Sequence, residues 1–190
     1  LWQYFVHGGP DNGVNLLAYA GCLLGVETEW REPAPLLRAG IYWPGARVMS
    51  LNNLRTHWIE DAPVVAITFY RALYQAGNLE PVDAVIAALR QRDLNPLPVF
   101  VASLKEALSA ETVDSIFGDA PPAIILNSTG FAVSKPNGER TPSPLERPGV
   151  PVIQMIFAGG NEDDWRDGLN GLSARDIAMN VALPEVDGRI

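Results

Sequence analysis

Two carboxylates near the end of the chain have a spacing suited to metal or proton chemistry. Glu185 and Asp187 stand two residues apart after Pro184, where a helix-like run is expected to break into an acidic turn. Carboxylate oxygens hold hard cations and accept protons from a bound ligand. The competing interpretation is a solvated acidic turn with Arg189 as ion-pair partner. His7 could point into a cleft, or could be hydrogen-bonded within its own turn.

Polar, small or flexible residues also follow each predicted strand. In open parallel sheets, ligands bind outside the carboxyl ends of the strands. The residues at these ends are Phe69–Arg71, Ala102–Ser103, Asn127–Gly130 and Ala158–Gly160. Because Asn, Ser and Gly are ordinary turn residues as well, a binding cleft and plain loop chemistry stay open as alternatives.

The sequence lacks the common motifs for nucleotides and zinc. Gly8-Gly9 does not have the glycine spacing of a dinucleotide fingerprint, and nothing matches the Walker phosphate loop or a nucleophile elbow. With two histidines and neither an HxxxH nor a CxxC motif, a closed zinc site is not expected. ATP chemistry is therefore not expected on this chain.

Alternating strands and helices must position these residues. Near-continuous apolar runs are typical of strands buried in a parallel sheet, and four segments have this pattern: 64–70, 97–102, 122–127 and 150–158. Helical spacing follows Pro81 and covers 104–117, and Asn161 and Ser173 are placed to begin further helices. The prediction is an open, mainly parallel α/β sheet with flanking helices, Rossmann-like or flavodoxin-like.

The first 38 residues are expected to be a separate segment from an adjoining region. The run 2–6 reads as a strand, a leucine-rich helix follows up to Gly25, and prolines make 27–37 a linker. Residues 39–190 then form the α/β domain, in which the proline-rich stretch 134–148 predicts an exposed, mobile loop. Trp43 and Trp58 lie in or near its first strand and loop.

Composition limits the function classes. The chain has 190 residues, 47% of them hydrophobic, and a formal net charge of -8. An acidic protein does not suit nucleic-acid binding, and no apolar run reaches the roughly 20 residues that a membrane span needs. One cysteine, without a possible internal disulfide, fits a cytoplasmic protein. Because the chain begins without Met, we expect a piece of a longer protein.

Five ordered segments together resemble the large-subunit family of aerobic cobaltochelatase and magnesium chelatase. They are His7–Asn12 with its leucine-rich helix, Phe69–Ala72, Leu94–Val101, Asn127–Ala132 and, most specifically, Gly171–Ile190. The resemblance spans the whole chain, and the residues at Leu94–Pro98 and Ile177–Asn180 favour the cobalt branch.

The resemblance implies a ligase-type, ATP-dependent enzyme that inserts Co²⁺, its substrate metal, into hydrogenobyrinic acid a,c-diamide during aerobic cobalamin synthesis. The family's large subunit binds this corrinoid tetrapyrrole, while two smaller AAA+ motor subunits bind Mg-ATP. Alternatives are the magnesium chelatase subunit, acting on protoporphyrin IX, and a non-catalytic scaffold domain that docks the motor subunits. The fragment alone is expected to be inactive.

The resemblance also ranks the site residues. Glu185 becomes the first candidate for a catalytic base and transient metal ligand, followed by Asp187 and then His7. Arg71 and Arg189 are candidates for pairing with the substrate's peripheral carboxylates. Further substrate-binding candidates share the strand end at Asn127, Ser128 and Thr129, and Trp43 or Trp58 could pack on the macrocycle.

Overall fold

The computed structural model describes residues 1–46, 49–130, 142–169 and 171–186. The strands of this part are β1 (Ala39–Ile41), β2 (Val64–Tyr70), β3 (Asn95–Val101), β4 (Ile124–Asn127) and β5 (Val152–Gln154). The helices are α1 (Trp2–His7), α2 (Pro10–Leu23), α3 (Leu51–Arg55), α4 (Arg71–Ala76), α5 (Glu80–Arg90), α6 (Ala107–Asp119), α7 (Glu162–Asp167), α8 (Ala174–Ile177), the π-helix η1 (Ala178–Ala182) and α9 (Leu183–Val186). None of the helices described is long and apolar enough to cross a membrane.

The described strands form one mixed, mostly parallel sheet in the order β1-β3-β2-β4-β5. β2 pairs in parallel with β3 on one side and with β4 on the other, and β5 continues in parallel from β4. β1 runs antiparallel to β3, with Ala39 opposite Val101. The predicted α/β class, with a mainly parallel sheet and flanking helices, is confirmed.

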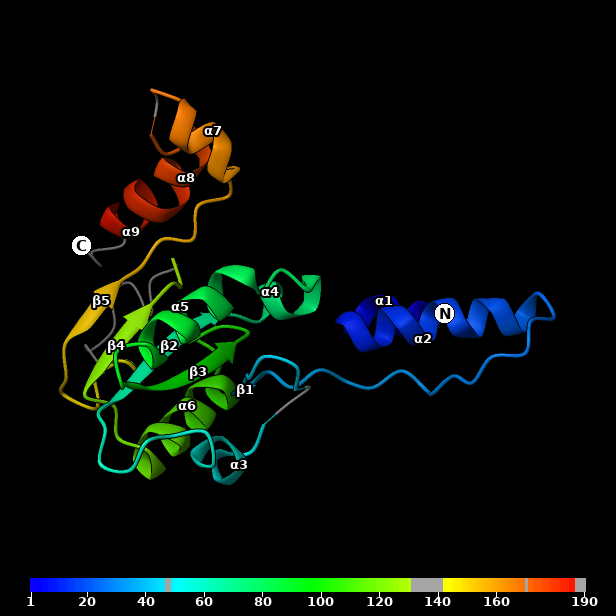
Figure 1. Ribbon diagram of the computed structural model, residues 1–190, viewed down its shortest axis with the longest axis horizontal. Coiled ribbons are helices and arrows are strands. Elements are labelled where there is room, and N and C mark those ends of the chain that lie inside the picture. The colour runs from blue at the N-terminus through cyan, green and yellow to red at the C-terminus, as the bar shows by residue number, and fades with distance from the viewer. Residues whose placement is uncertain (47–48, 131–141, 170, 187–190) are drawn as a thin grey trace.

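Helices cover both faces of the sheet because the chain reverses its direction across the sheet after β3. From β2 it crosses to β3 through α4 and α5, then returns past β2 to β4 through α6. Right-handed crossovers in opposite directions place their helices on opposite faces. Figure 1 shows α4 and α5 on one side of the sheet and α3 and α6 on the other.

The core lies between these layers. Fully buried side chains of β2 and β3, including Ile67, Phe69, Leu97 and Phe100, pack against the covering helices. Each such side chain contributes about 1.5–3 kcal/mol when it leaves water. The apolar runs at 64–70 and 97–102 therefore correspond to strands buried on both faces, as their composition predicts.

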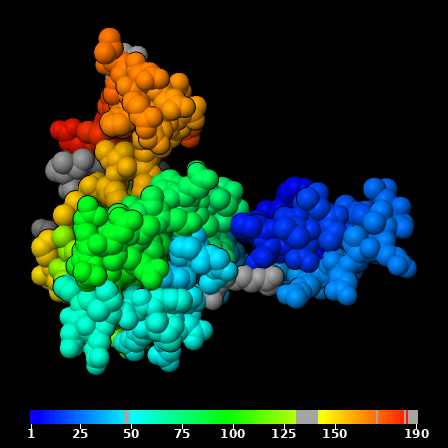
Figure 2. All heavy atoms as spheres, viewed as in Figure 1, coloured from blue at the N-terminus to red at the C-terminus, as the bar shows by residue number. Residues whose placement is uncertain are grey.

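Residues 1–38 form a helical arm, and the predicted strand at 2–6 is wrong. This run is helix α1, whose Tyr4 is 2% exposed and donates its hydroxyl to the carbonyl oxygen of Arg31. Asn12 of α2 holds the extended linker by hydrogen bonds to both backbone groups of Ala34, at 2.9 and 3.0 Å. A short apolar run does not distinguish strand from helix, and here packing against α2 and the linker selects helix. Figures 1 and 2 show the arm projecting from the α/β body.

Two further expectations need correction. The run 150–158 contains only the short edge strand β5, whose residues are not buried, because no described strand pairs with its outer side. The helix at the C-terminal end does not break at Pro184. It continues from η1 into α9, which includes Glu185, so the cost of a proline inside a helix, about 3 kcal/mol, does not end the helix here. Of the predicted loop 134–148, residues 134–141 lie outside the described residues.

Candidate functional site

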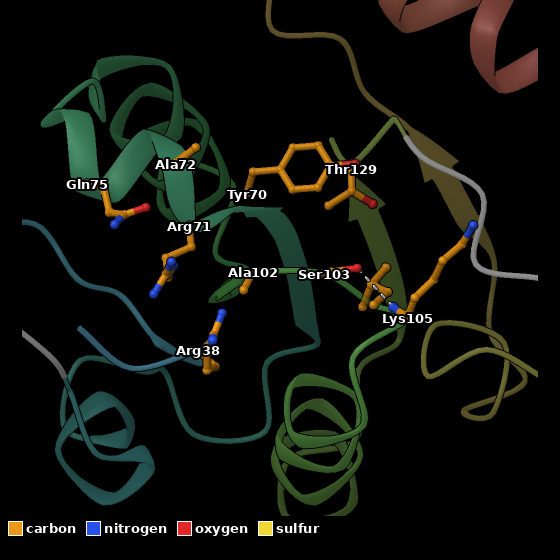
Figure 3. A pocket seen from close by; sticks show the side chains of 10 residues that line it. Arg38, Tyr70, Arg71, Ala72, Gln75, Ala102, Ser103, Lys105 and Thr129 are labelled. Atoms are coloured by element: carbon orange, nitrogen blue, oxygen red, sulfur yellow. Dashed lines mark hydrogen bonds between the residues drawn. The ribbon is translucent and has the colours of Figure 1, made fainter. Parts of the chain in front are cut away.

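A pocket of about 430 Å³ lies at the carboxyl ends of the central strands. Its walls come from the end of β2 with the start of α4, the loop after β3, and the residues after β4. The lining residues are Arg38, Tyr70, Arg71, Ala72, Gln75, Ala102, Ser103, Leu104, Lys105 and Thr129. Figure 3 shows the ring of Tyr70 pointing toward Thr129 and the side chains of Arg38 and Arg71 together on the other side.

The topology of the sheet explains why a pocket forms here. The connection after β2 runs along one face of the sheet and the connection after β3 runs along the other, so the segments that follow these two neighbouring strands diverge. Such a switch point leaves a crevice outside the strand ends, where open α/β sheets bind ligands. Tyr70 ends β2, Arg71 follows it, and Thr129 lies after β4, so a pocket is found at the strand ends, where the sequence left a cleft and plain loop chemistry open.

The pocket concentrates positive charge in a chain whose net charge is -8. Arg38 forms an ion pair with Glu106, at 3.5 Å between Nε and Oε1. Among the described residues, no carboxylate is ion-paired with Arg71 or Lys105. Burial, and then the neighbouring charge of Arg38, lower the pKa of Arg71, while Glu106 raises it. Arg71 remains cationic, and the pocket favours an anionic group.

Asn127 and Ser128 both make hydrogen bonds within the sheet. The Asn127 side chain is 2% exposed and its oxygen accepts hydrogen bonds from the hydroxyls of Thr68 and Thr129, at 2.7 and 2.8 Å. Its amide donates to Oε1 of Gln154 at 2.8 Å. Ser128 donates its hydroxyl to the carbonyl oxygen of Thr68 at 3.0 Å. These bonds hold the ends of β2, β4 and β5 together beneath the pocket.

Of the predicted substrate-binding residues, Arg71 and Thr129 therefore line the pocket, while Asn127 and Ser128 support it from below. Arg189 and Asp187 lie outside the described residues. Glu185 is exposed on α9 and is not among the pocket's lining residues. His7 does not line it either, but its backbone carbonyl accepts a hydrogen bond from the pocket residue Gln75 at 3.0 Å.

The described residues contain no cluster of three or more metal-binding side chains. Glu185 stays a candidate for transient contact with a metal ion, because a single carboxylate suffices for that role.

The two candidate tryptophans do not face the pocket. Trp43 is 7% exposed, stacks on His57 with ring centroids 4.8 Å apart, and lies under the Arg90 guanidinium. Trp58 donates its indole N–H to the carbonyl oxygen of Pro96 at 2.9 Å. Pro96 is near the amino end of β3, whereas the pocket lies at the carboxyl ends of the strands. Both rings therefore lie at the end of the sheet away from the pocket. Both rings pack on the core and neither lines the pocket, so their role as a macrocycle platform stays a prediction.

The C-terminal helices dock beside the end of β5. The Asp176 side chain is buried and accepts hydrogen bonds from the backbone N–H of Gly159 at 2.9 Å and from the Ser173 hydroxyl at 2.8 Å. These bonds lower the pKa of Asp176. A Cβ added at Gly130 would lie 3.1 Å from the carbonyl oxygen of Met179, so η1 also approaches the strand end after β4.

Sequence reasoning missed Arg38, Lys105 and Gln75 as pocket residues. Lys105 stands two residues after Ser103, at a predicted strand end, so the strand-end rule could have identified it. Arg38 precedes its strand instead of following it. It reaches the pocket only because β1 is antiparallel to β3, and the sequence pattern carries no indication of strand direction.

Comparisons with known proteins agree on one family. The model of the CobN/Magnesium Chelatase family matches residues 2–190. The chain is 48% identical over 199 residues to "Aerobic cobaltochelatase subunit CobN" of Sinorhizobium sp., and 25% identical over 216 residues to "Magnesium-chelatase subunit ChlH, chloroplastic" of Oryza sativa subsp. indica.

These matches cover all or nearly all of the chain, but only 16% and 15% of the two relatives. The solved structure "Catalytic Subunit of Cobaltochelatase from Mycobacterium tuberculosis" superposes on 99% of the chain, with a TM-score of 0.70 and 26% sequence identity. The chain covers 16% of that structure. Sequence and fold together show that this chain belongs to the CobN/magnesium chelatase family.

Proposed function

We propose that this chain is part of the large, tetrapyrrole-binding subunit of an ATP-dependent cobaltochelatase. The enzyme inserts Co²⁺ into hydrogenobyrinic acid a,c-diamide in aerobic cobalamin biosynthesis. Two smaller AAA+ subunits bind Mg-ATP and supply the work, which agrees with the lack of a phosphate loop in this sequence.

The observation that carries the proposal is the cationic pocket at the switch point of a chelatase-family sheet. Arg71 and Lys105 are not ion-paired with any described carboxylate there, so the pocket favours peripheral carboxylates of the substrate. Its volume of about 430 Å³ is toward the lower end of ligand sites, which span roughly 300–1,000 Å³. It fits an edge of a macrocycle, and other parts of the large subunit complete the site.

Chelation requires that inner pyrrole nitrogens lose protons and that the metal ion sheds water. Glu185 is proposed as the base or transient metal ligand, with Asp187 and then His7 as further candidates. Its exposure on α9 leaves the Glu185 carboxylate accessible to a substrate. The identity of 48% to a cobaltochelatase subunit, against 25% to a magnesium chelatase subunit, favours cobalt as the substrate metal.

The test of this function uses the full-length large subunit with its motor partners. We expect an absorbance shift when the subunit is titrated with hydrogenobyrinic acid a,c-diamide, and cobalt insertion once ATP, Co²⁺ and the motor subunits are added. A larger shift with protoporphyrin IX would favour magnesium chelatase. If neither macrocycle shifts the spectrum of a folded subunit, a scaffold that docks the motor subunits replaces the proposal.

Glu185→Gln tests the catalytic assignment because it removes the charge and keeps the shape. We expect cobalt insertion to slow by about 100-fold or more, a typical contribution of general acid–base catalysis, with macrocycle binding unchanged. The matched control is Glu60→Gln, at an exposed residue before β2, which should insert cobalt at the normal rate. Normal insertion by Glu185→Gln would remove Glu185 from the mechanism.

A further inference from the structure

We propose that Arg38 and Arg71 form a carboxylate clamp in the pocket, and that Glu106 sets its affinity by competing with the incoming carboxylate for Arg38. The inference rests on the proposed function for the nature of the ligand, and it assigns roles to Arg38 and Glu106 in that same site.

The fold brings the two arginines to one wall of the pocket from distant parts of the sequence. Arg71 is the first residue of α4, directly after β2. Arg38 directly precedes β1, and the antiparallel register of β1 places it beyond the carboxyl end of β3. Nη1 of Arg71 lies 3.4 Å from the carbonyl oxygen of Leu36, on the same stretch as Arg38. Figure 3 shows both guanidinium groups on this wall, with the Lys105 amino group far across the pocket.

The charges of the clamp are not balanced. The positive charge of Arg38 lowers the pKa of Arg71, which shows that the two guanidinium groups repel each other. Within the described parts of the chain, Glu106 is the one carboxylate ion-paired with either of them. Two cations against one anion leave a net positive charge on this wall, so a second carboxylate would relieve the repulsion.

The Glu106 carboxylate is held in place by a hydrogen bond from α6. Its Oε2 accepts a hydrogen bond from the hydroxyl of Ser109 at 3.1 Å, and Ser109 is fully buried in α6. Its Oε1 reaches Nε of Arg38 at 3.5 Å, and the two side chains are 34% and 53% exposed. An ion pair that is both long and this exposed is weak. Glu106 is therefore a fixed counter-charge that a better-placed carboxylate can displace from Arg38.

Guanidinium groups bind carboxylates through two parallel hydrogen bonds, and they do not gain a comparable bond from a neutral amide or ester. The clamp therefore distinguishes ionised from amidated side arms. A substrate that carries both kinds of arm, as an acid diamide does, would be oriented by the arm that the clamp accepts. Glu106 keeps this binding moderate, since each carboxylate must compete for Arg38.

The experiment measures dissociation constants for the full-length large subunit by absorbance titration. The probes are hydrogenobyrinic acid a,c-diamide and its methyl ester, in which the carboxylates are neutral. Arg71→Met should weaken binding of the acid by about tenfold, which corresponds to about 1.4 kcal/mol, and should leave binding of the ester unchanged. Glu106→Gln, whose oxygen still accepts from Ser109, should tighten binding of the acid by about threefold, or about 0.7 kcal/mol.

Matched controls change the same charges elsewhere. Arg92→Met alters an exposed residue after α5, and Glu111→Gln an exposed residue of α6, and both should bind like the wild type.

Tighter binding by Glu106→Gln cannot come from misfolding, so the prediction holds even if Arg71→Met folds poorly. If Glu106→Gln weakens binding, Glu106 positions Arg38 and the competition is wrong. If both pocket variants bind the acid like the wild type, the clamp is wrong while the proposed function stands. If the wild type binds neither probe, the clamp and the proposed function are both wrong.

Discussion

Asn127 connects three strands through one buried side chain. Its hydrogen bonds reach Thr68 of β2, Thr129 after β4 and Gln154 of β5. A buried amide whose donors and acceptor all have partners stabilises the sheet mainly because removing it leaves those partners unsatisfied. The floor of the pocket therefore depends on a residue that does not itself contact the pocket.

Asn127→Ala is expected to lower the free energy of unfolding by about 3 kcal/mol, because the hydroxyls of Thr68 and Thr129 and the side-chain oxygen of Gln154 lose a partner. Urea denaturation measures this change. Asn52→Ala, at an exposed position in α3, should change stability by less than about 0.5 kcal/mol. A loss for Asn127→Ala no larger than for this control would mean that water replaces the missing bonds.

Asp176 makes the docking of the C-terminal helices sensitive to acid. Hydrogen bonds from the Gly159 N–H and the Ser173 hydroxyl lower its pKa below the ordinary value of 3.8. The contribution of the ionised carboxylate to docking is present above that value and is lost as the pH falls through the lowered pKa. The Gly159 amide resonance in an NMR titration should therefore shift with a midpoint below 3.8. A midpoint at or above 3.8 would contradict the hydrogen-bonding role.

Among the elements, β1 depends most on a close backbone approach. A Cβ at Gly40 would lie 3.0 Å from Cζ and 3.2 Å from Cε1 of the buried Phe100 ring. Only glycine lets this antiparallel edge strand lie against β3 with the ring in its present position. Because Arg38 directly precedes β1, displacement of the strand would also move one wall of the pocket.

Gly40→Ala should therefore destabilise the protein by about 1–3 kcal/mol through overpacking. Gly118→Ala provides a control of opposite sign. Gly118 lies in α6, where an added Cβ meets nothing within 4 Å, so alanine should stabilise the helix by about 0.5–1 kcal/mol. Thermal unfolding of the two variants compares them directly. Equal stability of Gly40→Ala and the wild type would show that Phe100 can move aside.

The elements that could be predicted from sequence are those whose local pattern matches their burial. The continuous apolar run at 64–70 corresponds to β2, and the Ser173 side chain caps α8 as its residue type suggests. Trp2–His7 was misread because six residues contain too few periods to separate helix from strand. Pro184 was misread because a proline inside a helix has a finite cost, about 3 kcal/mol, and the helical backbone continues through it from η1 into α9.

The pocket could be predicted in part. The strand-end rule points to Arg71 and Thr129, because both follow parallel strands whose carboxyl ends meet at one edge. It does not show that Asn127 and Ser128, at the same strand end, also make hydrogen bonds within the sheet. Arg38 reaches the pocket because β1 runs antiparallel to β3, and Glu106 is linked to the pocket by its ion pair with Arg38. Both depend on tertiary contacts between residues far apart in the sequence.

At the scale of the whole molecule, an acidic chain carries a cationic pocket at the switch point of its sheet. The arm of residues 1–38 contributes to that pocket as well as projecting from the body. Its backbone meets Gln75 at Gly9, where the amide donates to the Gln75 carbonyl oxygen at 2.9 Å, and its last residue is Arg38. The pocket therefore belongs jointly to the arm and the α/β body, and it presents positive charge to whatever completes the site.

The central claim is that this pocket holds a carboxylate at the edge of a tetrapyrrole. A structure of the full-length large subunit with hydrogenobyrinic acid a,c-diamide bound tests it most directly. We predict a carboxylate oxygen of the macrocycle about 2.7–2.9 Å from a guanidinium nitrogen of Arg71, the distance of a charge-assisted hydrogen bond. A macrocycle bound elsewhere, with no part of it in contact with Arg71 or Arg38, would contradict the claim.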